Sequence, residues 1–366
     1  MARWRTWLAL VAGVLALGLP GAGPLPAPAV AGCHGPFDEA HPPGACWRPF
    51  SDRSPFNRPL PRKPRQAGDS AAVAAAVASW GSGPRIVSGV ADTADDFGHP
   101  IYFSARRNPS FRVDCVEFGG DCELDGERVR IPNLARPAAG GDAHMAVIDQ
   151  RDGVEYDFYD VITKPAGGGR LVVGWGGKTK IDDERSKGLG AEATASGFAL
   201  SAGIIRPAEL RAGEIDHALF MTVPCTRGSS VYPSGPGAGT SCARSDESRP
   251  APPAMGQRLY LEMSKGEVKG LPVPRWERTI LQAMRRYGMF VGDTGGGGDW
   301  GIQFESPSSF TSFGRSDPWL GLGQRLGLAP YPESDGTTRY LWDMRGAVDW
   351  ATELRVAAPC VSHRGC

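Results

Sequence analysis

The stretch His144–Val161, HMAVIDQRDGVEYDFYDV, decides the fold class of this 366-residue chain. Apolar and polar residues alternate on both sides of Asp152-Gly153, a dipeptide typical of tight hairpin turns, which predicts two antiparallel strands. A loop of two or four residues gives the same alternation, with one apolar core face formed by Met145, Val147, Tyr156 and Phe158. The opposite face then carries His144, Ala146, Ile148, Glu155, Asp157 and Tyr159. A three-residue loop would instead move His144 to the side of Tyr156.

The rest of the chain also has the pattern of short strands joined by turns, because 50 glycines and 32 prolines separate short β-rich segments. We expect further strands at 85–90, 101–104, 170–174, 215–223 and 258–263. Three helices are expected, at 71–80 after Ser70, at 207–211, and from Pro274 to Gly288 with an apolar stripe of Trp276, Ile280, Met284 and Tyr287. These patterns predict a mainly β fold, a jelly-roll-like β-sandwich with a few short helices and long disulfide-stapled loops.

The N-terminus has the layout of a secretory signal. Arg3 and Arg5 precede an apolar run that ends at Pro20, and Ala29-Val30-Ala31 supplies a cleavage site. We therefore expect residues 1–31 to be removed, residues 32–366 to form a single domain, and the protein to be secreted. A lipoprotein anchor at Cys33 is the minor alternative, since Val30-Ala31-Gly32-Cys33 also fits a lipidation motif. The apolar run is too short to span a membrane, and we find no other candidate.

All eight cysteines follow the cleavage site, and an even number in an oxidising compartment predicts four disulfides. Pairing between sequence neighbours is favoured, because each pair brackets a segment rich in glycine, proline or serine. The predicted pairs are Cys33–Cys46, Cys115–Cys122, Cys225–Cys242 and Cys360–Cys366. Their spacing does not suit zinc, and we expect no metal or other cofactor.

Charge argues against nucleic acid as a partner. The chain has 40 basic and 40 acidic residues, and residues 1–31 hold two arginines and no acids, so the mature protein would carry a formal charge of minus two. We expect a monomer whose partner is a polysaccharide or oligosaccharide.

The hairpin face that carries Glu155 and Asp157 could be a solvated outer surface or a catalytic groove. Sugar hydrolysis needs one carboxylic acid and one carboxylate, and two acids spaced two residues apart on a strand project the same way. The run from Glu155 to Asp160, EYDFYD, resembles the Glu-x-Asp-x-x-Glu strand of laminarinase-type jelly-roll glycoside hydrolases. That resemblance implies Glu155 as acid/base or nucleophile and Asp157 as the residue that orients it. Asp160 departs from the pattern, since the family has glutamate there.

Other residues complete the predicted groove. His144 and His217 are candidate proton shuttles or substrate ligands, although a histidine on an apolar strand face is more often a core residue. His144 with Tyr159 or Tyr156 would equally suit a polysaccharide lyase. Tyr159, Asp293, Trp175 and Trp300 are predicted to bind substrate, with both tryptophans expected to be exposed because glycines flank them.

The chain resembles a group of secreted actinobacterial proteins. Four short motifs carry the resemblance: GDAHM from residue 141, EYDF from 155, EIDHAL from 214 and YGMFVGD from 287. The resemblance implies an extracellular location. We therefore expect a secreted carbohydrate-active enzyme, with glycoside hydrolase favoured over lyase. The alternative is a non-catalytic secreted protein that binds carbohydrate or cell wall. A trypsin-like protease is disfavoured, because Thr294 stands where the Gly-Asp-Ser-Gly-Gly motif has serine.

Overall fold

The computed structural model describes residues 32–359 except 82, 182–183, 243–250, 296–297 and 333–337. The described residues belong to one compact unit, Ala31–Cys366. The expected signal peptide, residues 1–31, and the expected pair Cys360–Cys366 lie outside the described residues.

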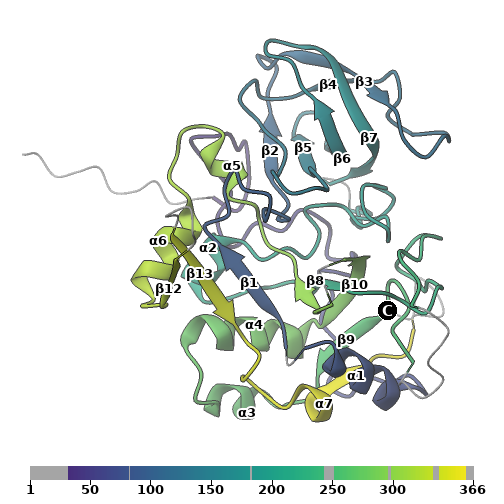
Figure 1. The fold of residues 1–366 in the computed structure, drawn as a ribbon, viewed down its shortest axis with the longest axis vertical. Coiled ribbons are helices and arrows are strands. Elements are labelled where there is room, and N and C mark those ends of the chain that lie inside the picture. The colour runs from purple at the N-terminus through teal and green to yellow at the C-terminus, as the bar shows by residue number, and fades with distance from the viewer. Residues whose placement is uncertain are drawn as a thin grey trace, which may run out of the picture. The chain divides into compact units, whose positions relative to one another are not determined.

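The larger sheet has six strands in the order β2-β5-β6-β7-β3-β4 (Figure 1). The strands are β2 (Ile101–Ser104), β3 (Ser110–Cys115), β4 (Arg128–Arg130), β5 (Met145–Asp149), β6 (Val154–Thr163) and β7 (Gly169–Lys180). Strands β5 and β6 form the predicted hairpin around residues 150–153, with Met145 opposite Phe158 and Ile148 opposite Glu155. The four-residue loop confirms the predicted grouping of side chains on the two faces. The pairs β2–β5 and β3–β7 are parallel, so the sheet is mixed.

Strand β7 extends six residues beyond the predicted Gly174, through a Gly-Trp-Gly-Gly sequence that suggested a break. Two of these positions require glycine, because the backbone of neighbouring segments lies too close to leave room for a Cβ atom. A Cβ atom at Gly176 would lie 2.7 Å from the Asp157 carbonyl oxygen, and one at Gly177 would lie 2.4 Å from that of Ala191. These glycines therefore allow tight packing of the loop around Ala191 on the sheet.

A second sheet has five strands in the order β11-β8-β10-β9-β14, and a third has the order β1-β13-β12. The five strands are β8 (Leu219–Val223), β9 (Arg258–Leu261), β10 (Met289–Thr294), β11 (Gly301–Ile302) and β14 (Leu354–Val356). The third sheet contains β1 (Arg85–Ser88), β12 (Pro330–Pro332) and β13 (Thr338–Asp343). Strand β10 was not among the predicted strands, and it pairs in parallel with β8.

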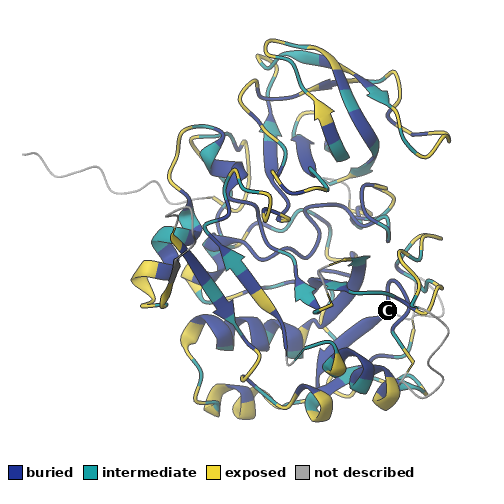
Figure 2. Ribbon diagram, in the orientation of Figure 1, coloured by how far each residue is buried: buried dark blue, intermediate teal, exposed yellow. Residues whose placement is uncertain are grey.

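The helices are short, and α4 is the longest of those described. They are α1 (Ser70–Ser79), α2 (Pro207–Ala212), α3 (Lys265–Gly270), α4 (Arg275–Arg286), α5 (Ser308–Thr311), α6 (Pro318–Arg325) and α7 (Trp350–Glu353). Helix α4 begins after Pro274 as predicted and buries the stripe of Trp276, Ile280 and Met284. Figure 2 shows the strands of the five-stranded sheet largely buried, while α3 is mostly exposed.

The main core contains several tryptophans, including one that we expected at the surface. Trp276, Trp319 and Trp342 are buried there, and the Trp342 ring centroid lies 5.2 Å from that of Trp276 and 5.6 Å from that of Trp319. Trp300 is only 1% exposed and packs edge-on against Trp350. The prediction that Trp300 lines an exposed rim is therefore wrong, because its indole belongs to this core.

The mainly β fold with short helices and disulfide-stapled loops is confirmed, although the strand order does not by itself identify a jelly roll. The described residues contain the predicted disulfides Cys33–Cys46, Cys115–Cys122 and Cys225–Cys242. Because the Cys33 sulfur is bonded to Cys46, it has no thiol to receive a lipid. Among the described residues, no helix has the length and apolar character needed to cross a membrane.

Candidate functional site

Glu155 and Asp157, the predicted catalytic pair, lie beneath the segment that contains Leu200 and Ser201. Both acids are 0% exposed. Glu155 accepts hydrogen bonds from the Ser201 amide at 2.9 Å and from the Ser201 hydroxyl at 2.5 Å, and Asp157 accepts one from the Leu200 amide at 2.8 Å. The expectation that these acids line an open groove is therefore wrong, since their carboxyl oxygens face protein groups.

The electrostatics of this pair suit a structural clamp. Burial raises the pKa of Glu155, and burial together with the charge of Glu155 raises the pKa of Asp157 well above its usual range. Within the pair, the charge of Glu155 thus disfavours a second negative charge on Asp157. Glu155 receives both donors of Ser201, which holds this segment against β6.

His144 is buried just before β5, and its ring centroid lies 5.1 Å from that of His99, which is buried just before β2. The Nε2 atom of His144 donates to the Ala193 carbonyl oxygen at 3.0 Å, and the His144 ring lies 5.8 Å from the Tyr159 ring. Burial lowers the pKa of His144, against the opposing effect of Asp142. The imidazole therefore packs beside Tyr159 and does not face solvent.

His217 lies before β8, not within a strand as predicted, and it joins a buried ion-pair group. Its Nε2 lies 3.0 Å from a Glu209 oxygen, and the Arg206 guanidinium lies 2.8 Å from the same oxygen. Arg206 also donates to the carbonyls of Gly44 and Trp47. Although burial acts to raise it, the pKa of Glu209 is held below its usual value by Arg206 and His217. His217 thus belongs to a core clamp and not with His144.

Carboxylates and aromatic rings that are at least partly exposed meet elsewhere, where loops adjoin β6, β7 and β10. We call this group the acidic–aromatic cluster, which consists of Glu117, Phe118, Asp142, Tyr159, Asp160, Trp175 and Asp293. Burial raises the pKa of the Tyr159 phenol. The negative charges of four carboxylates in the cluster raise it further, those of Asp142, Glu117, Asp160 and Asp293. The cluster therefore contains three residues predicted to bind substrate, Tyr159, Trp175 and Asp293, together with four that were not predicted.

Asp293 is the carboxyl group of this cluster with the largest change in acidity. Its oxygens accept hydrogen bonds from the amides of Thr294 at 2.7 Å and Ala195 at 3.4 Å. Burial raises the pKa of Asp293 to about 7, and the nearby charge of Asp142 raises it as well. Asp293 is nevertheless partly exposed. It is thus an acid that retains its proton near neutral pH and can exchange it with solvent.

The aromatic part of the cluster surrounds Phe118, which is 73% exposed. The Phe118 ring centroid lies 6.0 Å from that of Tyr159 and 5.9 Å from that of Trp175. Trp175 is half-buried, so the prediction of an exposed indole is met only in part. Exposed aromatic rings beside carboxylates are the groups expected where a sugar ring is held through its apolar face.

Local backbone geometry brings the acids together. Asp160 has φ 49° and Ala143 has φ 38°, both unusual for residues other than glycine. The Asp160 amide donates to the Asp142 carbonyl at 2.8 Å, beside a register shift in β6 that follows Val161. Backbone in such sparsely populated conformations, next to a β-bulge, is common at functional sites.

Gly174 on β7 has a related role. A Cβ atom there would lie 3.0 Å from both the Asp160 Cβ and a Glu117 carboxylate oxygen. The glycine therefore lets these two acids approach the strand. Asp142 and Glu117 were not predicted as site residues because each lies in a loop. The only sequence feature that pointed to either residue is the Gly-Asp-Ala-His motif before the hairpin, which contains Asp142.

The four carboxylates of the cluster are spread over its surface and do not gather in threes. Within the described ranges, no three histidine, cysteine, aspartate or glutamate side chains form a group suited to hold a metal ion.

Comparison of the chain with family models, curated proteins and solved structures finds no match. Functional inference therefore rests on the chemistry of the cluster itself.

Proposed function

We propose that this protein is a secreted glycoside hydrolase that cleaves an extracellular polysaccharide at the acidic–aromatic cluster, with Asp293 as the general acid. The observation that carries the proposal is a partly exposed carboxyl group whose pKa is raised to about 7 beside other carboxylates. A glycosidic oxygen needs a proton as its bond breaks, and a carboxylic acid that is still protonated near neutral pH supplies one.

Asp142 is the proposed second carboxylate. Its charge acts on both Asp293 and Tyr159, which places it within electrostatic reach of the acid. In this role the Asp142 carboxylate attacks the anomeric carbon or removes a proton from the attacking water. Phe118, Tyr159 and Trp175 would hold the sugar ring by stacking.

A lyase reaction at the cluster is less favourable. It requires a base to abstract a proton, but burial and four carboxylates raise the pKa of Tyr159, which disfavours the phenolate. His144 is buried with its Nε2 proton bound to the Ala193 carbonyl. The surrounding carboxylates would also repel the uronate that a lyase acts on. Hydrolysis of a neutral sugar linkage therefore fits these residues better.

Location outside the cell is part of the proposal. Three disulfides among the described residues suit an oxidising compartment, as does the signal-like sequence of residues 1–31.

The test is incubation of the purified protein with neutral and acidic plant, algal and bacterial polysaccharides, read by new reducing ends and by the ultraviolet absorbance of unsaturated uronides. We expect new reducing ends without that absorbance. Asp293→Asn should lower the rate by at least about 100-fold. Asp299→Asn is the matched control, because Asp299 lies in the same glycine-rich segment and pairs with Arg85 instead.

Two results would overturn the proposal. Growth of the uronide absorbance would identify a lyase. Binding to a polysaccharide without cleavage, unchanged in Asp293→Asn, would identify a carbohydrate-binding protein.

A further inference from the structure

Three hollows on this protein are joined by shared lining residues. The first has a volume of about 430 Å³ and lies beside α3 and α4, and the second, of about 580 Å³, shares Arg285 and Arg286 with it. The third, of about 220 Å³, shares Leu60, Pro61 and Pro64 with the second. We call the three together the basic trench.

The first hollow has an unusual charge for a chain with equal numbers of acids and bases. Two acids line it, Glu214 and Asp216. Its cationic lining residues are Lys265, Lys269, Arg275, Arg278, Arg285 and Arg286. The net positive charge of this hollow is not visible from the total charge of the chain, because its residues come together from both α3 and α4.

Among the residues that the structure describes, only Arg286 of these cations has a carboxylate partner. Arg286 pairs with Asp216 at 2.9 Å, but Arg275 and Arg278 donate to backbone carbonyls, which fix the guanidinium groups without neutralising them. Lys265 is exposed, as is Lys269. The trench therefore presents positioned positive charge to solvent.

The same two helices hold the cations in place. The Gln282 amide donates to the Lys265 carbonyl at 3.2 Å, which ties α3 to α4. Burial and the neighbouring charge of Arg286 lower the pKa of Arg285, so like charges are held together here. Repulsion between like charges at one surface destabilises the free protein. An anionic ligand bound there would reduce this repulsion.

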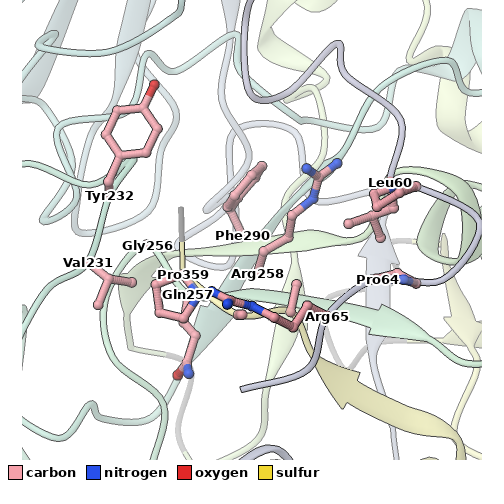
Figure 3. Close-up of a pocket in the computed structure, with 13 residues that line it drawn as sticks. Leu60, Pro64, Arg65, Val231, Tyr232, Gly256, Gln257, Arg258, Phe290 and Pro359 are labelled. Atoms are coloured by element: carbon pink, nitrogen blue, oxygen red, sulfur yellow. The ribbon is translucent and has the colours of Figure 1, made fainter. Parts of the chain in front are cut away.

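The second and third hollows change the chemistry along the trench. The second adds two exposed cations, Arg62 and Lys63, and one acid, Glu262, which pairs with Arg355 at 2.8 Å. The third is lined by Tyr232 and Gln257 as well as apolar residues (Figure 3). Its Arg258 guanidinium donates to the carbonyls of Tyr287 and Arg58. The exposed Arg65 also lines this hollow, so positive charge continues along the trench and is joined by hydroxyl, amide and apolar groups.

We propose that the basic trench binds an acidic polysaccharide, a linear polymer of carboxylated or sulfated sugars. A series of connected hollows suits an extended chain, and a flat membrane surface would not enter it. In the third hollow, the tyrosine hydroxyl, glutamine amide and apolar groups beside Arg65 and Arg258 suit the hydroxyl groups and apolar face of a charged sugar ring. The trench is a binding site separate from the acidic–aromatic cluster, so it anchors the protein whether or not the cluster is catalytic.

The test is a binding titration of the full-length secreted protein with polygalacturonate, with dextran as the neutral polymer. We expect polygalacturonate to bind and its affinity to fall as salt is added, because the contacts are electrostatic. In the double variant Lys265→Gln/Lys269→Gln the Kd should rise about tenfold. Both lysines are exposed, so the variant should keep the fold, which circular dichroism would check.

The matched control is Arg128→Gln/Lys180→Gln, which removes two exposed cations from the six-stranded sheet. It should leave the Kd within about twofold of that of the unmodified protein. Equal weakening in both variants, or no binding of polygalacturonate, would overturn the proposal. Tighter binding of oligo-dT or of phosphatidylglycerol vesicles than of polygalacturonate would also overturn it. Asp293→Asn should bind polygalacturonate normally, which separates this site from the proposed catalytic one.

Discussion

Replacement of Ser201 by alanine tests whether Glu155 and Asp157 serve the fold and not the chemistry. The Ser201 hydroxyl donates to Glu155 at 2.5 Å, and both residues are buried. A hydrogen bond to a charged group contributes about 1.5–3 kcal/mol, so Ser201→Ala should lower the free energy of unfolding by about 2 kcal/mol. For a mature chain of about 335 residues, this corresponds to a fall of roughly 3 °C in Tm.

The loss should depend on pH in a defined direction. The Ser201 bonds act to lower the pKa of Glu155, against the larger raising effect of burial, so they stabilise the ionised carboxylate. The difference in stability between wild type and Ser201→Ala should therefore be full at pH values above the folded-state pKa of Glu155. It should shrink as the pH falls through that pKa, because the carboxyl then becomes neutral.

Ser104→Ala is the matched control. Ser104 is also buried, but its hydroxyl has no hydrogen-bond partner among the described residues. Removing an unpaired buried hydroxyl should leave stability unchanged or raise it slightly. Urea unfolding at several pH values would measure both variants. An equal effect of the two substitutions, or a pH-independent loss in Ser201→Ala, would refute the clamp.

Two further predictions concern stability. Glu209→Gln removes the anionic partner of the buried Arg206 guanidinium and should cost about 3–5 kcal/mol, measured by urea unfolding. A loss below about 1 kcal/mol would show that the ion pair adds little. Cys225→Ser/Cys242→Ser opens a loop with a sequence separation of 17 and should lower stability by roughly 3 kcal/mol. An unchanged midpoint in thermal unfolding would contradict that value.

Much of the local structure could be predicted from sequence, because it depends on neighbouring residues. The alternation around Asp152-Gly153 predicted which side chains share each face of the β5–β6 hairpin, and the structure confirms that grouping. The apolar stripe of Trp276, Ile280 and Met284 likewise predicted the buried face of α4.

What covers each face could not be predicted in the same way. Glu155 and Asp157 are buried by Leu200 and Ser201, which are 43 to 46 residues away in the chain. No local pattern reports such a contact. Trp300 was misplaced for a related reason, since its flanking glycines describe backbone freedom and not the core that receives the indole.

The acidic–aromatic cluster illustrates the same limit. Tyr159, Trp175 and Asp293 were predicted as substrate-binding residues from three separate segments, and the structure brings them into one cluster, although their role in binding stays a prediction. Asp142 was missed because its effect on Asp293 arises only when the loop before β5 meets the end of β10. The raised pKa of Asp293 is a property of the folded protein.

The pH dependence of kcat/KM on a cleaved polysaccharide tests the assignment of Asp293 most directly. A general acid must be protonated, so activity should fall as the pH rises through about 7, the pKa of Asp293. A basic limb centred near that value, retained in Asp299→Asn, is the predicted result. Activity that stays constant well above neutral pH would contradict the role of Asp293 as the acid.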